Sequence, residues 1–366
     1  MQSGLEGVVV AETRLSEVDG EGGRLVICGH DVEALAQRCD FESLCALLWD
    51  GHLPAAAAHA ALRAGLGAAR VRAFSRLGGL GDALGAPDAM EALRAALAHL
   101  RASELGGVDL KLELTAAMAV VAAAWTRRQR GQAPLPPDPS LGHAADFLRM
   151  ATGQPVDAAR TAALDAYLVT AADHGMNAST FTARVVASTQ SDAVSAIVAA
   201  LGALKGPLHG GAPGPVLAML DQIGHTEAAA GWIANELAAG RRIMGMGHRV
   251  YRVRDPRAAV LERAVERLQQ SGLRSSRLAL ARAVEAVAIA SLNEHRPDRR
   301  LAANVEFYTA VILDAVGLPQ ELFTATFAVA RVAGWLAHVD EQWATGRLIR
   351  PASRYIGAMP DQRAVA

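Results

Sequence analysis

Two stretches of the chain, at positions 115–125 and 192–204, are apolar on nearly every side when they are drawn as helices. The first reads TAAMAVVAAAW and the second reads DAVSAIVAALGAL. A helix without a polar face has to be buried inside a helical core or in a subunit interface. These stretches therefore predict an architecture of many close-packed helices.

Helix start and stop signals recur after residue 31, whereas the first thirty residues are different. The short β-branched runs GVVVAET and GRLVICG, separated by DGEGG, predict a small strand-and-turn unit. Three later segments have capping signals: Asp40 with Gly51, Thr226, and Asp255 with Pro256 and Gly272. The expected fold class is all-α, mainly helical, with a small N-terminal β element.

Composition excludes several classes of protein. The 366 residues are 51% hydrophobic and carry a net charge of −1, which is typical of a soluble globular protein and gives no reason to expect a nucleic-acid partner. No run approaches the roughly 20 consecutive apolar residues of a membrane span. The start of the chain lacks the pattern of a signal peptide, so we expect a cytoplasmic location. Cys28, Cys39 and Cys45 form no CxxC pair and are expected to be buried free thiols.

Three histidines lie beside glycines or small polar residues at helix boundaries: His174, His209 and His248. Taken singly, each is explained by a hydrogen-bonded histidine at a helix end. A metal site is disfavoured, because there is no HxxEH or HxH pairing and no cysteine nearby. A phosphate cradle is disfavoured as well, because GPLHGGAPGP lacks the GK[ST] of a P-loop and GMGHRV lacks the third glycine of a dinucleotide fingerprint.

Arginines supply a second signal. The segment HRVYRVRDPRA contains four of them, and Arg331 lies in the otherwise apolar FAVARVAGWLAH. A buried charge at Arg331 is costly unless it meets an anion. Arg350 precedes a proline, which favours an extended chain. Because guanidinium groups match planar carboxylates, a small di- or tricarboxylate is the natural ligand. For Arg249 or Arg254 alone, a surface salt bridge is the simpler interpretation.

The segments GPLHGGA, GHRVYRVRDPRA and NVEFYTAVILDAVGLP, in this order, closely resemble the citrate synthase family, and the similarity covers almost the whole chain. The resemblance implies a homodimer in which residues 1–211 and 317–366 form a large helical domain and residues 212–316 form a small domain that closes over the substrates. It also implies condensation of acetyl-CoA with oxaloacetate and hydrolysis of the citryl thioester, without a metal or redox cofactor.

The same resemblance assigns roles to individual residues. It implies that His209 stabilises the enol of the acyl-CoA, that His248 polarises and protonates the oxaloacetate carbonyl, and that Glu306 abstracts the proton. The oxaloacetate pocket would contain His174, Asn177, Arg257, Arg331 and, from the neighbouring subunit, Arg350. Arg252 and Arg254 would face the CoA phosphates.

One position departs from the family pattern, because Glu306 stands where an aspartate is typical. A glutamate has nearly the same pKa, but it is longer by one methylene, and a misplacement of about 1 Å can cost on the order of a hundredfold in rate. Locally, Asn304 is a good N-cap and Glu306 suits the first turn of a helix. Two alternatives stay open: a 2-methylcitrate synthase that uses propionyl-CoA, and a weakly active paralogue that binds CoA or a tricarboxylate.

Overall fold

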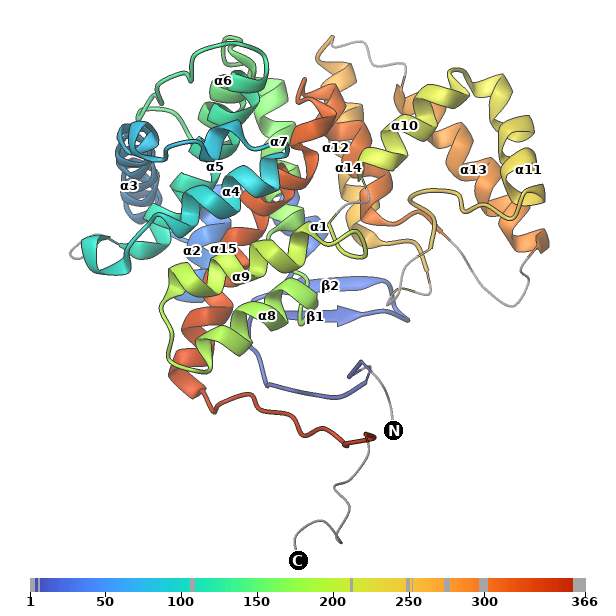
Figure 1. Cartoon of the computed structure of the whole chain (residues 1–366). Coiled ribbons are helices and arrows are strands. Elements are labelled where there is room, and N and C mark those ends of the chain that lie inside the picture. The colour runs from blue at the N-terminus through green and yellow to red at the C-terminus, as the bar shows by residue number, and fades with distance from the viewer. Residues whose placement is uncertain are drawn as a thin grey trace, which may run out of the picture.

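The computed structural model describes residues 4–5, 7–105, 109–210, 213–247, 251, 253–272, 277–295 and 302–357. Over these residues the chain forms fifteen α-helices and one small sheet (Figure 1), which confirms the mainly helical fold class. The helices are α1 (Val32–Arg38), α2 (Phe41–Asp50), α3 (Ala56–Ser75), α4 (Ala89–Ala98), α5 (Leu110–Gln129), α6 (His143–Thr152), α7 (Ala158–Ala171), α8 (Ala178–Ala187), α9 (Ala193–Lys205), α10 (Pro213–Ile223), α11 (Ala229–Ala238), α12 (Pro256–Gln270), α13 (Arg277–His295), α14 (Val305–Ala315) and α15 (Phe323–Thr345). Short 3-10 turns occur at Leu77–Gly79, Ala83–Gly85, Ala102–Leu105, Thr226–Ala228 and Gln320–Leu322.

Two long helices form the centre of the larger part of the molecule. Helix α5 is buried at every position from Glu113 to Thr126, as its apolar sequence predicts. Helix α15 is buried over most of its length and packs against α5, α7, α8 and α9. Helix α9 buries only one face, and Ser195 and Gly202 are exposed on the other. The prediction of an interior helix is therefore confirmed fully for α5 and on one face for α9.

The segment Gln320–Thr345 is the one helix among the described residues that is long and apolar enough to cross a membrane. Its most apolar window is 94% buried inside the protein. It is a core helix, which a soluble protein of this size readily contains. A search for consecutive apolar residues misses it because Thr326 and Arg331 interrupt the run.

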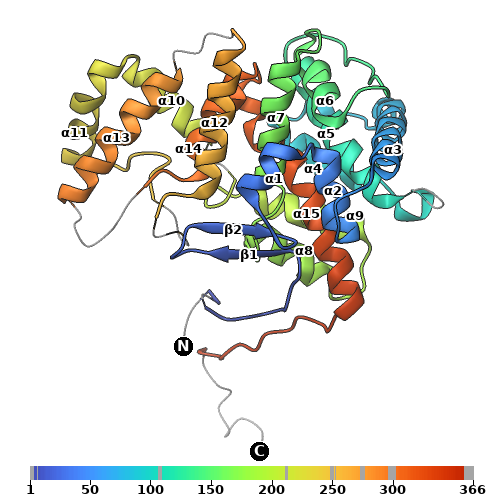
Figure 2. The same ribbon diagram turned by 180° about the vertical axis from the view of Figure 1, so that it is seen from behind.

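A second group of helices stands beside this core. Figures 1 and 2 show α10, α11 and α13 on one side of the molecule, with α12 and α14 between them and α7. Helix α12 packs against both α7 and α14. These five helices, α10 to α14, fall within the predicted small domain of residues 212–316, and the division into two domains stays a prediction.

The N-terminal β unit is a three-stranded antiparallel sheet in the order β1 (Ser16–Asp19), β2 (Arg24–Ile27) and β3 (His30–Asp31). Ser16 pairs with Ile27, and Val26 pairs with Asp31. The predicted strand-and-turn unit is confirmed, but the run GVVVAET lies before β1 and forms no strand. The cysteines are free, and only Cys45 is fully buried, so the expectation of burial was wrong for the half-buried Cys28 and Cys39.

Two of the three predicted helix starts are confirmed. The side chain of Asp40 accepts a hydrogen bond from the backbone of Ser43 at the start of α2, and Asp255 caps α12 in the same way. The prediction for Thr226 was wrong. Its hydroxyl donates to Glu227 instead of accepting from a helix N–H, the chain first forms a 3-10 turn, and α11 begins only at Ala229.

Candidate functional site

The loop between α7 and α8 carries two of the predicted binding residues. His174 is 9% exposed, and its Nε2 lies 3.2 Å from the hydroxyl of Tyr251. Asn177 is the N-cap of α8, where its Oδ1 accepts from the backbone N–H of Thr180 at 3.1 Å. Its amide nitrogen donates to Gly175 O at 3.1 Å. Asn177 therefore shapes the turn that follows His174, and this capping role is visible in the local sequence.

The second predicted histidine, His209, lies in the turn after α9 and points toward the start of α8. The backbone N–H of Ser179 donates to Nε2 of His209 at 3.4 Å, and Ser179 Oγ, whose hydroxyl can donate as well, lies 2.8 Å from the same nitrogen. Because a backbone N–H can only donate, Nε2 is unprotonated and Nδ1 carries the ring proton. Burial, together with the nearby charge of Arg331, lowers the pKa of His209 to about 4. At neutral pH the imidazole is therefore uncharged and presents Nδ1–H as a donor.

Arg331 is the buried cation that the sequence predicts inside an apolar helix. It is 1% exposed in α15, and its Nε donates to the carbonyl of Ala171 at 2.6 Å, while the guanidinium lies 4.7 Å from the ring centroid of Phe327. Within the described part of the chain, its two terminal nitrogens form no hydrogen bond. Burial lowers the pKa of Arg331 to about 10. A guanidinium in this state is prepared for an anionic ligand.

Asp255 joins the starts of α12 and α14, and it brings Arg257 and Glu306 to the same place. Its carboxylate accepts from Arg257 Nε at 3.0 Å and Nη2 at 2.7 Å, and from the backbone N–H of Val305 at 3.2 Å. The side chains of Asp255 and Arg257 are almost fully buried. Glu306 follows Val305 directly, so the acid and the arginine are held by one shared carboxylate.

The charges of this region act on one another. Burial raises the pKa of Glu306, while Arg257 and Arg331 act in the opposite direction. The hydroxyl of the buried Tyr167 feels the charges of all three, and burial raises its pKa too. Tyr167 lies in α7, and the three helices that carry Arg257, Glu306 and Arg331, namely α12, α14 and α15, all pack against α7.

The segment that leads to His248 is tied to the start of α14. Gly247 N donates to Ala302 O at 2.8 Å, and Asn304 Nδ2 donates to Gly247 O at 2.9 Å. Gly245 has a φ of +73°, and a Cβ there would lie 2.8 Å from the ring of Phe307, so only glycine fits. His248 itself and Arg252 lie outside the described residues.

Two further predicted residues are not part of this cluster. Arg254 donates to Glu285 at 2.8 Å and to Glu262 at 2.7 Å, so these two acids engage its guanidinium within the α12–α13 region. Arg350 is exposed on the extended segment after α15, which runs away from the helices next to the N-terminal segment (Figure 1).

Other residues of the site were not predicted from the sequence. Asp255 was interpreted only as a helix cap, and Ser179, which bonds His209, and Trp335, whose Nε1 donates to Ser179 Oγ at 3.1 Å, have no distinguishing pattern. Asp173, which is fully buried, directly precedes His174, and that adjacency was the one available signal.

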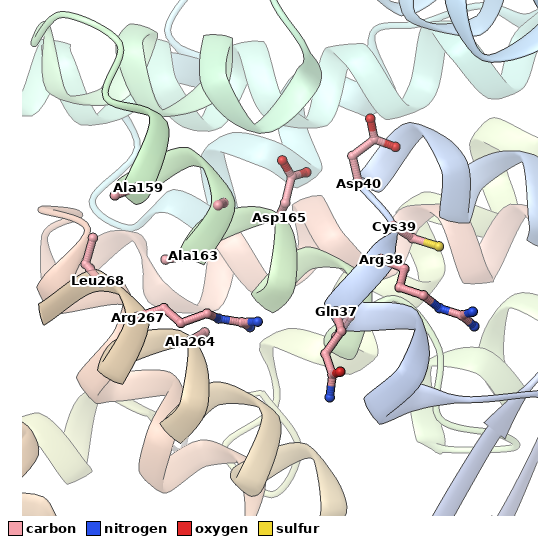
Figure 3. Close-up of a pocket in the computed structure, with 12 residues that line it drawn as sticks. Gln37, Arg38, Cys39, Asp40, Ala159, Ala163, Asp165, Ala264, Arg267 and Leu268 are labelled. Carbon is pink, nitrogen blue, oxygen red and sulfur yellow. The ribbon is translucent and has the colours of Figure 1, made fainter. Parts of the chain in front are cut away.

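A cavity of about 360 Å³ lies elsewhere, between α7, α12 and the link from α1 to α2. Figure 3 shows Asp165, Arg267 and Asp40 around it. None of the predicted site residues lines this cavity. Among the described residues, no group of three histidine, cysteine, aspartate or glutamate side chains is placed to hold a metal ion.

Comparison with known proteins gives one consistent result. Residues 4–352 match the family model described as citrate synthase, C-terminal domain. The chain is 39% identical to the citrate synthase of Haloferax volcanii, over 98% of this chain and 96% of that protein. It is 37% identical to the 2-methylcitrate synthase of Mycobacterium tuberculosis, over 98% and 91%. The structure of the Thermoplasma acidophilum citrate synthase in ternary complex with carboxymethyl coenzyme A and oxaloacetate superposes with a TM-score of 0.87, at 30% identity, over 98% of this chain and 97% of that one.

Proposed function

Because this chain belongs to the citrate synthase family, we propose that it condenses acetyl-CoA with oxaloacetate and hydrolyses the resulting thioester to citrate and CoA. The observation that supports the proposal is the packing of α12, α14 and α15, which carry Arg257, Glu306 and Arg331, against α7. The charge of Arg331 also acts on His209, which is neutral. The set contains a carboxylate base, two cations for carboxylate groups and a hydrogen-bond donor for an oxyanion. The condensation needs each of these groups.

In the first step, the carboxylate of Glu306 takes a proton from the methyl carbon of the thioester. The electron pair moves onto the thioester oxygen, which accepts a hydrogen bond from Nδ1–H of His209. A neutral donor suits this role, because its proton stays on the imidazole while it stabilises the developing oxyanion. The lowered pKa of His209 keeps the ring neutral at the pH where Glu306 is ionised.

In the second step, the enol carbon forms a bond to the carbonyl carbon of oxaloacetate, whose oxygen takes a proton from His248. Gly247, which precedes His248 in the sequence, is hydrogen-bonded to Ala302 and Asn304, just before α14. Water then hydrolyses the citryl thioester and releases CoA.

Arg257 and Arg331 hold the carboxylates of oxaloacetate and so place its carbonyl over the enol carbon. Positioning of this kind can supply several kcal/mol of the barrier reduction. Arg350 completes the set from the second subunit of a dimer, and its exposed place on an extended segment supports this arrangement. Closure of residues 212–316 over the substrates excludes water until the carbon–carbon bond has formed. A cytoplasmic dimer is part of the same proposal.

Glu306 is fixed by its surroundings in a way that favours a working base. Asn304 caps α14 through the backbone N–H of Phe307, and Asp255 binds the N–H of Val305, so the first turn of the helix has little freedom. A fixed backbone lets a longer side chain adopt one reproducible position. Among the proposed CoA contacts, Arg254 ranks below Arg252, because Glu262 and Glu285 already bind Arg254.

The acyl group is the main alternative within the proposal. A relative at 37% identity is named 2-methylcitrate synthase, whose substrate would differ from acetyl-CoA by one methylene. A methylene in a pocket discriminates by about 1 to 3 kcal/mol. The second alternative, a weakly active paralogue that binds CoA or a tricarboxylate, rests on Glu306 alone.

The test is to measure CoA release with oxaloacetate and either acetyl-CoA or propionyl-CoA, for the wild type and for Glu306→Gln. We expect turnover with acetyl-CoA in the wild type and a loss of at least about a hundredfold in the variant. A preference for propionyl-CoA would establish the 2-methylcitrate alternative. Absence of turnover with both thioesters would rule out the enzyme and leave the binding paralogue.

A further inference from the structure

One face of α15 contacts the loop that carries His174. The four residues of this face follow the spacing i, i+3, i+4 and i+7: Arg331, Gly334, Trp335 and His338. A Cβ at Gly334 would lie 2.3 Å from the carbonyl oxygen of Ala172 and 2.9 Å from Asp173 Oδ1. The absence of a side chain therefore lets the backbone of α15 press directly on this loop.

Asp173 lies at the centre of this contact and is completely buried. Its Oδ1 is 3.1 Å from His338 Nε2, and its Oδ2 accepts from the hydroxyl of Ser16 and, at 3.3 Å, from the backbone N–H of Gly175. Burial alone would raise the pKa of Asp173, but His338, Arg331 and Ser16 outweigh it and hold the pKa below its ordinary value. The side chain is therefore a buried carboxylate with three hydrogen-bond donors.

The hydrogen-bonding roles of the two ring nitrogens of His338 follow from its other neighbour. Arg184 Nε donates to His338 Nδ1 at 3.0 Å, and an arginine has donors only. Nδ1 must therefore be unprotonated. Nε2 carries the ring proton and donates a hydrogen bond to Asp173. Arg184 is in turn held by Gln342, at 3.0 Å, and by Glu341. The whole chain of bonds is polarised in one direction, from Arg184 to the carboxylate of Asp173.

The backbone N–H of Gly175 donates to Ser16 Oγ at 2.9 Å and to Asp173 Oδ2 at 3.3 Å, so the carboxylate and the hydroxyl bound to it together close a turn around His174. A side-chain oxygen that accepts from the backbone N–H two residues later forms an Asx-turn, which fixes the conformation of the residue between them. That residue is His174. The same carboxylate also raises the pKa of Arg331 against the effect of burial. Asp173 thus acts on two residues of the proposed oxaloacetate pocket without belonging to the reacting groups.

We infer that Asp173 is a positioning residue for oxaloacetate: its carboxylate, oriented by His338 and Ser16, fixes the turn of His174 against the face of α15 that carries Arg331. The inference rests on the proposed function, because that function makes the pocket an oxaloacetate site. Its specific consequence is an effect on oxaloacetate, since the hydrogen bonds of Asp173 lead to His338, Ser16 and the turn of His174 and not to His209.

The first test compares Asp173→Asn with Asp165→Asn. In Asp173→Asn the amide NH2 replaces one carboxylate oxygen, so one of the three donors around this side chain faces another donor and loses its hydrogen bond. We expect KM for oxaloacetate to rise about tenfold and KM for acetyl-CoA to change less than about twofold. Asp165 is the matched control, because it accepts from the backbone of Phe41 and lines the separate cavity. Burial raises its pKa, and its hydrogen bond and its cavity lie away from the proposed oxaloacetate pocket, so Asp165→Asn should change neither KM.

The second test uses His338→Gln and His338→Leu. A glutamine amide offers an acceptor for Arg184 and a donor for Asp173, so His338→Gln should keep KM for oxaloacetate close to that of the wild type. Leucine offers neither group, so His338→Leu should raise this KM as Asp173→Asn does. Nitrogen NMR of His338 should show a protonated Nε2 and an unprotonated Nδ1. The reverse tautomer would overturn the hydrogen-bond assignment.

An unchanged KM for oxaloacetate in a folded Asp173→Asn protein would overturn the inference. Equal increases in KM for oxaloacetate and acetyl-CoA, together with a lower melting temperature, would also overturn the inference, because they would show that Asp173 only stabilises the fold. If the wild type shows no turnover, the proposed function fails separately. Calorimetric titration of the wild type and Asp173→Asn with oxaloacetate then measures the positioning effect directly, and equal affinities would overturn it.

Discussion

The carboxylate of Asp255 binds the guanidinium of Arg257 through two nitrogens, Nε at 3.0 Å and Nη2 at 2.7 Å, although the two residues are separated by a single position in the chain. The same carboxylate accepts from the backbone N–H of Val305. One buried side chain, that of Asp255, therefore caps α12, orients Arg257 and binds the backbone at the start of α14. This relationship connects the proposed binding cation with the proposed base, Glu306.

Asp255→Asn should destabilise the protein, because it removes the negative charge that the buried guanidinium of Arg257 contacts through two nitrogens. Removing one partner of a buried ion pair costs about 3 kcal/mol or more. Asparagine is an equally good N-cap, so the loss can be attributed to the ion pair. Urea unfolding measures the change. Asp221→Asn, which removes an exposed partner of Arg277, should cost less than about 1 kcal/mol. Equal losses in the two variants would contradict this explanation.

Glu306 should give the reaction an acid limb at higher pH than an ordinary glutamate. Burial raises its pKa, and the base works only when it is ionised, so kcat/KM should increase as the pH rises through that raised pKa. Glu306→Asp keeps the carboxyl group and should retain an acid limb, whereas Glu306→Gln should have none. The pH profile of CoA release measures this. An acid limb that persists in the Gln variant would assign it to another group.

His209 should make the folded protein sensitive to acid. Its pKa is about 4 in the folded state against an ordinary 6.5, so the unfolded chain binds the proton first as the pH falls. The stability that the neutral ring contributes is present above pH 6.5 and is lost as the pH falls toward 4. Melting temperatures between pH 7 and pH 4.5 should therefore fall less for His209→Asn than for the wild type. Parallel curves would refute the assignment.

Arg350 should act across a dimer interface. A mixed dimer of Arg350→Ala and Glu306→Gln chains contains one site with both wild-type residues if Arg350 serves the partner, and no such site if it serves its own chain. Because a two-fold dimer has two equivalent sites, co-refolding equal amounts should restore about a quarter of the wild-type activity. Each variant refolded alone is the control. A mixture with no more activity than the separate variants would place Arg350 in its own site.

Much of this protein can be derived from the sequence because the relevant signals are local. The apolar stretch at 115–125 predicts a buried helix, and Asp40 and Asp255 predict helix starts from three or four neighbouring residues. The burial of Arg331 is confirmed, and the anion site that a buried charge predicts there stays a prediction. Thr226 shows the limit of such reasoning, because its hydroxyl donates a hydrogen bond to the adjacent Glu227 instead of capping the helix backbone.

The tertiary structure decided what depends on residues far apart in the chain. The backbone of Ser179 sets the protonated nitrogen of His209, thirty positions away, and α15 holds Asp173 through His338. Glu262 and Glu285 engage Arg254, which the motif alone would leave free for a phosphate. A sequence specifies which groups are present and, where a side chain such as Asp40 or Asp255 caps the backbone locally, how a helix begins. Only packing between helices decides which donors and acceptors meet, and this determines the charge and orientation of each group in the site.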